Sequence, residues 1–463
     1  MKSWHIVGIC GIGMSGLAQF ARAMGISVSG SDRALEKSEN AALKAALQAQ
    51  DIALYSQDGS RFAPGNPPAD AVIYSTAIEE SNPDFAASQG IERIHRATAL
   101  KMLILQRCQT GRLSVAVAGS CGKTSTTAMI AEALCNVNCD AECINGGMIK
   151  AFANGNYPGN YHPGSGAIVF EADESDKSLL EFHPDYAVVL NIGTDHYSKD
   201  ELQEMFAQFA NQAQKGAVMS EEVYSLLREK LRSDLAVSTF GTVQADCTVT
   251  GYLSQKGESF ADFNENNLRK LPAPGQHTAL NAAAAAALLG MLNIEREQAL
   301  QAVLNTHGVA RRFDYHGRTA RGAAVYDDYA HMPEKAANII AAARELTGES
   351  GKVLVFFQPH GYGPFGFMQA ELAKQLSEVL RPQDKFYLAE PYYAGGSSSF
   401  SPHAADVLPE WKSLYPNLPA ELAEDRETLR QKLMTEAGED DLILIMGARD
   451  NTLAEFAASL AHR

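Results

Sequence analysis

Residues 115–127, VAVAGSCGKTSTT, carry the clearest chemical signal in the chain. A strand-like apolar run ends in a Gly-Ser-Cys-Gly turn, after which Lys123 and Thr124 open a helix-like segment. Backbone N–H groups in such a turn attract a phosphate, the lysine adds a positive charge, and the threonine hydroxyl can ligate Mg²⁺. The loop has the short G-x-x-G-K-T form, because Val117 stands where the common phosphate loop has its first glycine. We predict a nucleoside triphosphate site formed by Gly119, Ser120, Cys121, Gly122, Lys123, Thr124 and Ser125.

Two later apolar segments end in residues that could bind a metal ion. Segment 167–180, AIVFEADESDKSLL, runs into Glu171, and three more carboxylates follow it: Asp173, Glu174 and Asp176. Segment 186–198 ends in the same way at Asp195 and His196. Hard cations prefer oxygen ligands, and carboxylates also cancel their charge. One solvated acidic turn would be ordinary, but two such strand ends downstream of one phosphate loop predict Mg²⁺ beside the triphosphate.

The N-terminal segment predicts a second phosphate-binding site. Gly11, Gly13 and Gly16 form G-x-G-x-x-G between a strand and a helix, and the next strand ends at Asp32. This unit binds a dinucleotide or another diphosphate that carries a ribose, including a UDP-sugar. Further strand ends on the same edge are expected to present Ser75, Thr76 and Arg96. Because the glycine motif alone is weak, two alternatives stay open: a dinucleotide-binding oxidoreductase, and a non-catalytic module that binds ATP or a UDP-sugar.

Strands and helices alternate along the whole chain, which predicts an α/β fold. The 463 residues correspond to about three domains at roughly 150 residues each. Within the central part, the Gly/Asn/Pro-rich segment 152–166 is expected to be a loop, and the alanine-rich segment after residue 276 a buried helix. In the last third, Asp327, Asp328 and His331 lie at a strand-to-helix junction.

Composition excludes several classes of protein. The chain has 39 Lys and Arg against 55 Asp and Glu, a formal charge of -16, so nonspecific binding to nucleic acid is not expected. We find no run of eighteen apolar residues and no secretion signal, and therefore expect a cytoplasmic protein that does not enter the membrane. Its seven cysteines are expected to be reduced. Cys135, Cys139 and Cys143 are four apart, but without a histidine at ligand spacing they are better explained as core residues.

Taken together and in order, the motifs resemble those of the Mur ligase family, ATP-dependent amide-forming enzymes of peptidoglycan assembly. They are GICGIGMSGLAQ, AGSCGKTSTTAMI, FEADESDKSLL, NIGTDH, HTALNAAAAAALL, GVARRFDYHG, YDDYAHMPEKA and FFQPH. The resemblance covers nearly the whole chain. It implies a Rossmann-like UDP-sugar domain over 1–108, a central P-loop ATPase domain with a mostly parallel sheet over 109–312, and a Rossmann-like domain over 313–463. The third domain would admit the amino acid and close over ATP.

The resemblance also implies a reaction. ATP would convert the carboxylate of a UDP-N-acetylmuramate-type substrate into an acyl phosphate, and an amino acid, expected to be L-alanine, would attack it to give an amide, ADP and phosphate. Such an enzyme serves cell-wall biogenesis, cell shape and cell division, uses ATP and Mg²⁺, and is expected to be a monomer or homodimer. A related ligase with another amine, acting in murein tripeptide recycling or outside peptidoglycan, stays open.

The family motifs assign catalytic roles to five positions. Lys123 would hold the β- and γ-phosphates, and Thr124 with Glu171 would hold one Mg²⁺. His196 would bind a second metal ion near the substrate carboxylate. Arg312 would reach the γ-phosphate.

The remaining positions would bind the nucleotide and the sugar. Asn281 and His277 would contact the adenine side, whereas Asp328 and His331 would bind the ribose and phosphates from the third domain. The positions implied for the UDP-sugar are Gly11, Gly13, Ser15, Asp32, Ser75, Thr76 and Arg96.

Several residues depart from the pattern of the alanine-adding members. Those members usually have histidine at Cys121, a second histidine at Met332 and asparagine at Thr278. They also have arginine at Gly361 and an acidic residue at Gly396. The ATP and metal positions are therefore kept, while the pocket for the incoming amine is changed.

Overall fold

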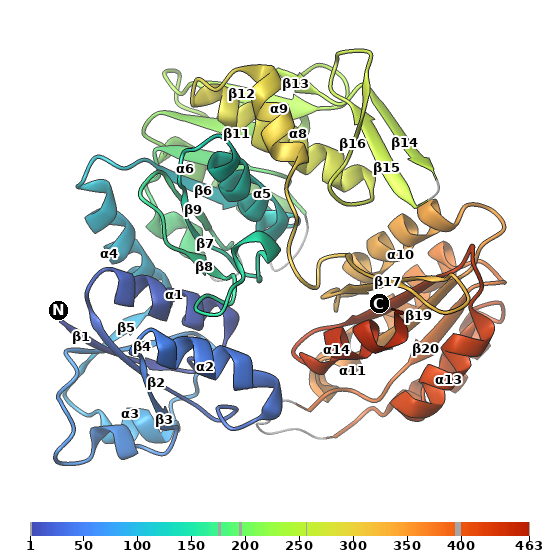
Figure 1. Ribbon diagram of the computed structural model, residues 1–463, viewed down its shortest axis with the longest axis horizontal. Coiled ribbons are helices and arrows are strands. Elements are labelled where there is room, and N and C mark those ends of the chain that lie inside the picture. The colour runs from blue at the N-terminus through green and yellow to red at the C-terminus, as the bar shows by residue number, and fades with distance from the viewer. Residues whose placement is uncertain (1, 175–176, 194–196, 256, 394–399, 463) are drawn as a thin grey trace. The chain divides into compact units, whose positions relative to one another are not determined.

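The computed structural model of the chain describes residues 2–174, 177–193, 197–255, 257–393 and 400–462 (Figure 1). It contains two compact units, which are described separately. The first unit comprises Met1–Gly251, Ala261–Pro272 and His277–Val309. The second comprises Tyr252–Phe260, Ala273–Gln276 and Ala310–Arg463. Strands and helices alternate in both, and most strand pairs are parallel, which confirms the predicted α/β class.

The first unit begins with a five-stranded parallel sheet in the order β3-β2-β1-β4-β5. Its strands are β1 (Ser3–Val7), β2 (Ser27–Asp32), β3 (Ala53–Ser56), β4 (Ala71–Tyr74) and β5 (Glu92–His95). The helices are α1 (Ile12–Ala23), α2 (Ala41–Ala49), α3 (Pro83–Ala87) and α4 (Arg96–Cys108). Strand alternation places Trp4 and Ile6 in the main core, whereas Val7 packs with Phe85 of α3 on the opposite face.

The same unit contains an eight-stranded sheet in the order β13-β12-β11-β10-β6-β9-β7-β8, in which β7 and β8 are antiparallel. Its strands are β6 (Ser114–Ala118), β7 (Glu142–Ile144), β8 (Tyr161–His162), β9 (Ile168–Glu171), β10 (Tyr186–Val189), β11 (Gly216–Ser220), β12 (Val237–Gly241) and β13 (Cys247–Thr248). The helices are α5 (Lys123–Asn136), α6 (Lys199–Asn211), α7 (Glu221–Leu227), α8 (Gln276–Met291) and α9 (Arg296–Leu304).

Two expectations about the central segments can be compared with these elements. The alanine-rich helix is α8, and its alanines 282–285 are fully buried, as predicted. The segment 152–166 is not wholly a loop, because it contains β8. The first two sheets share one apolar cluster, so the boundary at residue 108 stays a prediction.

The second unit has a six-stranded sheet in the order β17-β18-β22-β19-β20-β21, with only the β17–β18 pair antiparallel among the described strands. Its strands are β17 (Asp314–Arg318), β18 (Ala324–Asp328), β19 (Val353–Gln358), β20 (Lys385–Leu388), β21 (Ala420–Leu422) and β22 (Leu442–Gly447). The helices are α10 (Pro333–Thr347), α11 (Tyr362–Val379), α12 (Ala404–Leu414), α13 (Arg426–Glu436) and α14 (Thr452–Leu460). A small sheet is formed by β14 (Gly251–Gln255), β15 (Glu258–Asp262) and β16 (Leu268–Lys270).

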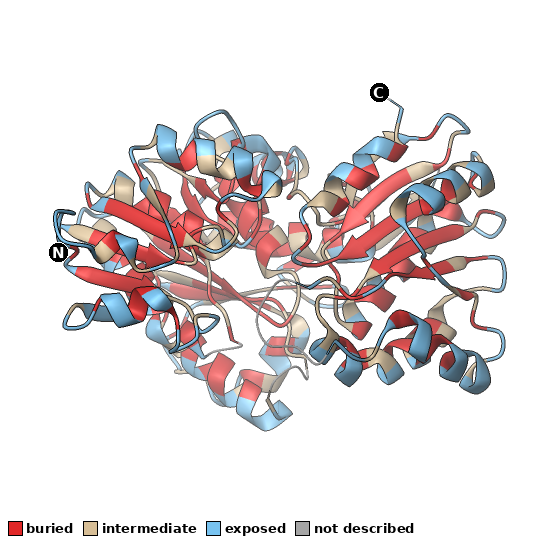
Figure 2. Cartoon of the chain, turned by 90° about the horizontal axis from the view of Figure 1, so that it is seen from below, coloured by how far each residue is buried: buried red, intermediate tan, exposed pale blue. Residues whose placement is uncertain are grey.

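The burial pattern follows the layers of each unit. Central strands are buried along their length, while the helices expose their outer faces (Figure 2). No helix in the described part of the chain is long and apolar enough to cross a membrane. Because the central strands are buried, polar side chains can meet a ligand in the loops at the carboxyl ends of these strands.

Candidate active site

The phosphate loop joins β6 to α5 at the centre of the eight-stranded sheet. Two of its residues have positive backbone φ angles, 141° at Gly119 and 86° at Gly122, which favour glycine. A Cβ atom on Gly119 would also lie 3.0 Å from the Cβ atom of Leu190. The helix then begins at Lys123, and Ser125 lies in its first turn. The short G-x-x-G-K-T motif thus forms the predicted strand, loop and helix.

Asn191, which follows β10, holds this loop in shape. Its Oδ1 atom accepts the Cys121 N–H at 2.8 Å, and its Nδ2 atom donates to the Cys121 carbonyl at 3.0 Å. The hydroxyl of Ser120 accepts the Gly193 N–H at 2.8 Å. We did not predict a role for Asn191. The sequence signal was its position in the NIGTDH motif, directly after a buried strand.

Lys123 is held by two acceptors at the mouth of the loop. Its Nζ atom donates to the Gly119 carbonyl at 2.7 Å and to both carboxylate oxygens of Glu174, at 2.7 and 3.0 Å. The side chains of Lys123 and Glu174 are only 16% and 5% exposed. Burial lowers the pKa of Lys123, but the negative charges of Glu174 and Asp173 outweigh that effect, and the pKa lies above its ordinary value. The lysine is therefore fully charged where a phosphate would bind.

Thr124 and Glu171 come together because β6 and β9 are neighbours in the sheet. The Thr124 hydroxyl donates to Glu171 Oε2 at 3.1 Å, and the other carboxylate oxygen accepts the Gly146 N–H. A hydroxyl and a carboxylate next to a phosphate loop are the oxygen donors that Mg²⁺ prefers, so the residues fit this ion. The other predicted ligand, His196, and the nearby Asp176 and Asp195 lie outside the described residues.

Helix α8 brings Asn281 to the same loop. A Cβ atom on Gly122 would lie 3.1 Å from Asn281 Oδ1, so the amide packs against the phosphate loop itself. His277 is exposed at the start of α8, and Thr278 beside it is buried. In the first unit, Lys123, Thr124, Glu171 and Asn281 therefore surround one loop.

The N-terminal glycine motif lies at the carboxyl edge of the five-stranded sheet and forms a second candidate site. Gly11 precedes α1, and Asp32 at the end of β2 accepts the Cys10 N–H at 2.9 Å. A Cβ atom on Gly13 would lie 2.9 Å from Arg96 Nη1, so the guanidinium packs directly on the glycine backbone. A positive charge and the N-terminus of a helix thus meet at one point, as an anionic ligand requires.

The order of the strands places Ser75 and Thr76 beside this motif. Both follow β4, which pairs with β1, and the strand order reverses between these two strands. Ligands of such sheets bind at this reversal. Ser15 is different: its side chain is fully buried, and its hydroxyl contacts the Gly11 carbonyl at 3.0 Å and Asn160 Nδ2 at 2.8 Å. The Ser15 hydroxyl therefore has a structural role, and the predicted part of Ser15 in binding the UDP-sugar stays a prediction.

In the second unit, the predicted nucleotide residues Arg312, Asp328 and His331 lie close together. Asp328 accepts the Phe313 N–H at 2.7 Å, and burial raises its pKa to about 6. The guanidinium of Arg312 lies 5.3 Å from the ring centre of Tyr329, whose carbonyl is 3.0 Å from His331 Nδ1. Burial lowers the pKa of His331 to about 4, so its imidazole is neutral at pH 7.

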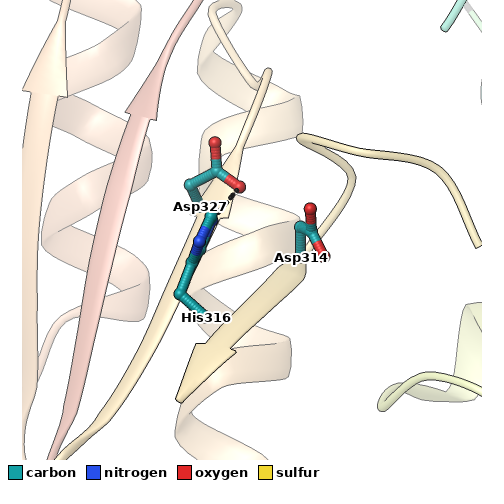
Figure 3. A group of neighbouring side chains, drawn as sticks. All are labelled: Asp314, His316 and Asp327. Atoms are coloured by element: carbon teal, nitrogen blue, oxygen red, sulfur yellow. Dashed lines mark hydrogen bonds and ion pairs between the residues drawn. The ribbon is translucent and has the colours of Figure 1, made fainter. Parts of the chain in front are cut away.

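A cluster with metal-type ligands lies nearby on β17 and β18. Figure 3 shows the carboxylate of Asp327 above the ring of His316, with Asp314 to one side. The His316 Nε2 atom is 3.0 Å from Asp327 Oδ1, and Arg311 Nε is 3.2 Å from Oδ2. Because Arg311 already neutralises the buried carboxylate, we assign this cluster to structure and not to a metal ion.

The departures from the alanine-adding pattern can be located in part. His360, at the end of the FFQPH motif, packs edge-on against His331 with ring centres 4.7 Å apart. Gly361 has a φ angle of 126°, which side chains rarely adopt. An arginine at this position would require a different backbone. Met332 precedes α10, and Gly396 lies outside the described residues.

Comparison with known proteins identifies the family. Residues 3–107 match the Mur ligase family catalytic domain, 117–289 the Mur ligase middle domain, and 311–449 the Mur ligase glutamate ligase domain. The UDP-N-acetylmuramate–L-alanine ligase of Renibacterium salmoninarum is 33% identical over 97% of this chain and 94% of its own.

Solved structures agree with this match. That of the UDP-N-acetylmuramate-alanine ligase from Thermotoga maritima has a TM-score of 0.78 and 26% identity, covering 99% of this chain and 98% of its own. A murein peptide ligase from Psychrobacter arcticus has a TM-score of 0.68 at 21% identity with the same coverage, which shows a shared fold. The chain therefore belongs to the Mur ligase family of ATP-dependent, ADP-forming ligases.

Proposed function

We propose that this ligase joins UDP-N-acetylmuramate to L-alanine in peptidoglycan precursor synthesis. ATP would phosphorylate the substrate carboxylate, and the amine would displace phosphate from the resulting acyl phosphate. The observation that carries the proposal is the meeting of Lys123, Thr124 and Glu171 at one sheet edge, in a chain 33% identical to a ligase of this name.

The positions of the described residues support a separate role for each part of the site. Lys123 would neutralise the β- and γ-phosphates, and the N–H groups of the loop at Gly119 and Gly122 would bind their oxygens. Thr124 and Glu171 would hold Mg²⁺, which when bound cancels charge on the phosphates. His196 as a second metal ligand remains part of this proposal.

The other predicted residues complete the proposal. Asp32 and Arg96, with the glycine motif, would bind the UDP-sugar, and Ser75 and Thr76 would line the same edge. Arg312, Asp328 and His331 would reach the nucleotide from the C-terminal domain. This assignment uses a UDP-sugar domain over 1–108, an ATP domain over 109–312 and a closing domain over 313–463, and it places the reaction in the cytoplasm.

Gly361 supports a second candidate, a ligase of the same type with another amine. Glycine stands here where the alanine-adding members have arginine, and its φ angle of 126° is one that side chains rarely adopt. A different charge in the amine pocket would select a different amine, such as a murein tripeptide.

A phosphate-release assay separates the two candidates. The chain is incubated with ATP, Mg²⁺ and UDP-N-acetylmuramate, and then with L-alanine, other amino acids or murein tripeptide. Release that requires L-alanine supports the first candidate, and release with another amine supports the second. If no amine raises phosphate release above the level without amine, ligation is refuted. Binding of NAD(P)H by such a chain would favour the oxidoreductase.

A further inference from the structure

Asn160 connects the proposed UDP-sugar loop to the central sheet. Its Nδ2 atom donates to the Ile12 carbonyl at 2.7 Å and to the Ser15 hydroxyl at 2.8 Å. Its Oδ1 atom accepts a hydrogen bond from Gln19 Nε2 at 3.0 Å. The carboxamide therefore uses both of its ends on the first two turns of α1, which begins at the glycine motif.

The backbone of Asn160 continues this connection toward the ATP site. Its carbonyl accepts the Asn145 N–H at 3.0 Å, and Asn145 Nδ2 donates to the Gly147 carbonyl at 3.1 Å. The intervening Gly146 donates its N–H to the carboxylate of Glu171. Asn160 is thus linked through one short strand end to the proposed metal ligand.

A packing contact joins the same turn to the phosphate loop helix. A Cβ atom on Gly147 would lie 2.9 Å from Thr124 Cγ2, so this backbone presses on the residue that follows the proposed catalytic lysine. The turn formed by residues 145–147 therefore touches both proposed magnesium ligands, Thr124 and Glu171.

The contacts that Asn160 makes with α1 and with residues 145–147 are buried and tightly packed. Asn160 and Gln19 are fully buried, and Asn145 is 1% exposed. A Cβ atom on Gly16 would lie 3.2 Å from the Asn160 carbonyl oxygen, and the rings of Phe20 and Tyr161 stack with centres 5.8 Å apart. The buried carboxamide of Asn160 is hydrogen-bonded at both ends, and such a group fixes one arrangement of the elements that it joins.

We propose that Asn160 is a positioning residue that holds the sugar-nucleotide loop in register with the phosphate and metal ligands. This inference rests on the proposed function. Phosphoryl transfer needs the substrate carboxylate and the γ-phosphate about 3–3.5 Å apart, and a displacement of about 1 Å can lower the rate ~10²-fold. Because the Asn160 side chain is fully buried and bonded to protein atoms, we expect its loss to change the relative placement of the two nucleotides and not their separate affinities.

The test compares Asn160→Ala with Asn156→Ala, an exposed position in the same segment. For each variant, kcat and the KM values for ATP and UDP-N-acetylmuramate are measured by phosphate release. We expect kcat of Asn160→Ala to fall ~10²-fold while both KM values stay within about threefold. The Asn156→Ala variant should match the wild type in all three values.

A milder variant guards against a folding defect. Ser15→Ala removes one of the two acceptors of Asn160 Nδ2 and should lower kcat several-fold with unchanged KM values. If Asn160→Ala does not fold, the positioning role is tested by Ser15→Ala alone, through a lower kcat with unchanged KM values. A full kcat, or a rise in either KM without a fall in kcat, would overturn the positioning role. A wild-type chain that releases no phosphate would instead overturn the proposed function, and this inference with it.

Discussion

Removing Lys123 is expected to destabilise the first unit as well as abolish catalysis. The Nζ atom lies 2.7 Å from a Glu174 carboxylate that is 5% exposed, so Lys123→Ala leaves a buried charge without its main partner. Breaking a buried ion pair from one side costs about 3–5 kcal/mol. The proximity of Asp173, which also attracts the lysine, adds repulsion in the variant. The free energy of unfolding should therefore fall by about that amount.

The double variant Lys123→Ala/Glu174→Gln separates stability from catalysis. Without the carboxylate no buried charge is stranded, and we expect about 2 kcal/mol or more of the loss to be recovered. Phosphate release should stay absent in both variants, because both lack the lysine charge proposed to neutralise the β- and γ-phosphates. The matched control is the Lys230–Glu204 pair, which has the same 2.7 Å separation but is 43% and 71% exposed. Its disruption should cost at most about 1 kcal/mol.

Urea unfolding can be followed in the first unit alone. The chain has two tryptophans, and Trp4 lies in the first unit while Trp411 lies in the second. In a Trp411→Phe background, fluorescence therefore reports the unit that contains the ion pair, which avoids treating a chain of two units as two-state. An unchanged midpoint for Lys123→Ala, or a double variant no more stable than the single one, would refute the argument. Restored phosphate release in the double variant would refute the role of the lysine.

Three further outcomes are expected. Gly13→Ala should push Arg96 away and raise the KM for UDP-N-acetylmuramate about tenfold at unchanged KM for ATP, and an equal rise in both would contradict this. Asn191→Ala should weaken ATP binding about tenfold in calorimetry, because the phosphate loop loses two hydrogen bonds; unchanged affinity would contradict it. Burial lowers the pKa values of His331 and His360 to about 4, so the unfolded chain binds protons more tightly and stability falls as pH drops from about 6.5 toward 4. At pH 5 the loss in the free energy of unfolding, measured by urea titration, should be about 2 kcal/mol for His331 and smaller for the less buried His360. A His360→Asn variant that loses as much as the wild type would contradict this.

The local elements at both glycine motifs could be predicted from the sequence. An apolar run followed by glycines and a helix former determines a strand, a turn and a helix within about fifteen residues, as at Lys123. The positive φ angles at Gly119 and Gly122 show why glycine is required at those two places. The buried helix α8 was also predictable, because a run of alanines is both apolar and helix-forming.

The partners of these elements depended on tertiary structure. Glu174 lies 51 residues from Lys123, and Asn191 lies 70 residues from Cys121. Asn160 lies 145 residues from Ser15, in a segment whose composition indicated only a loop. Each contact exists because particular strands became neighbours in the sheets, and neither composition nor periodicity encodes that order.

The amino-acid sequence by itself thus determined the strand, loop and helix at each glycine motif and indicated the family to which the chain belongs. Only the folded chain decided that Ser15 faces the interior, that Asn281 packs on Gly122, and that Asn160 bonds to the start of α1. The physical reason is the distance along the sequence over which each effect acts. Backbone preferences and hydrophobic periodicity act over a few residues. A buried hydrogen bond, in contrast, forms between any two groups that the packed sheets bring within about 3 Å.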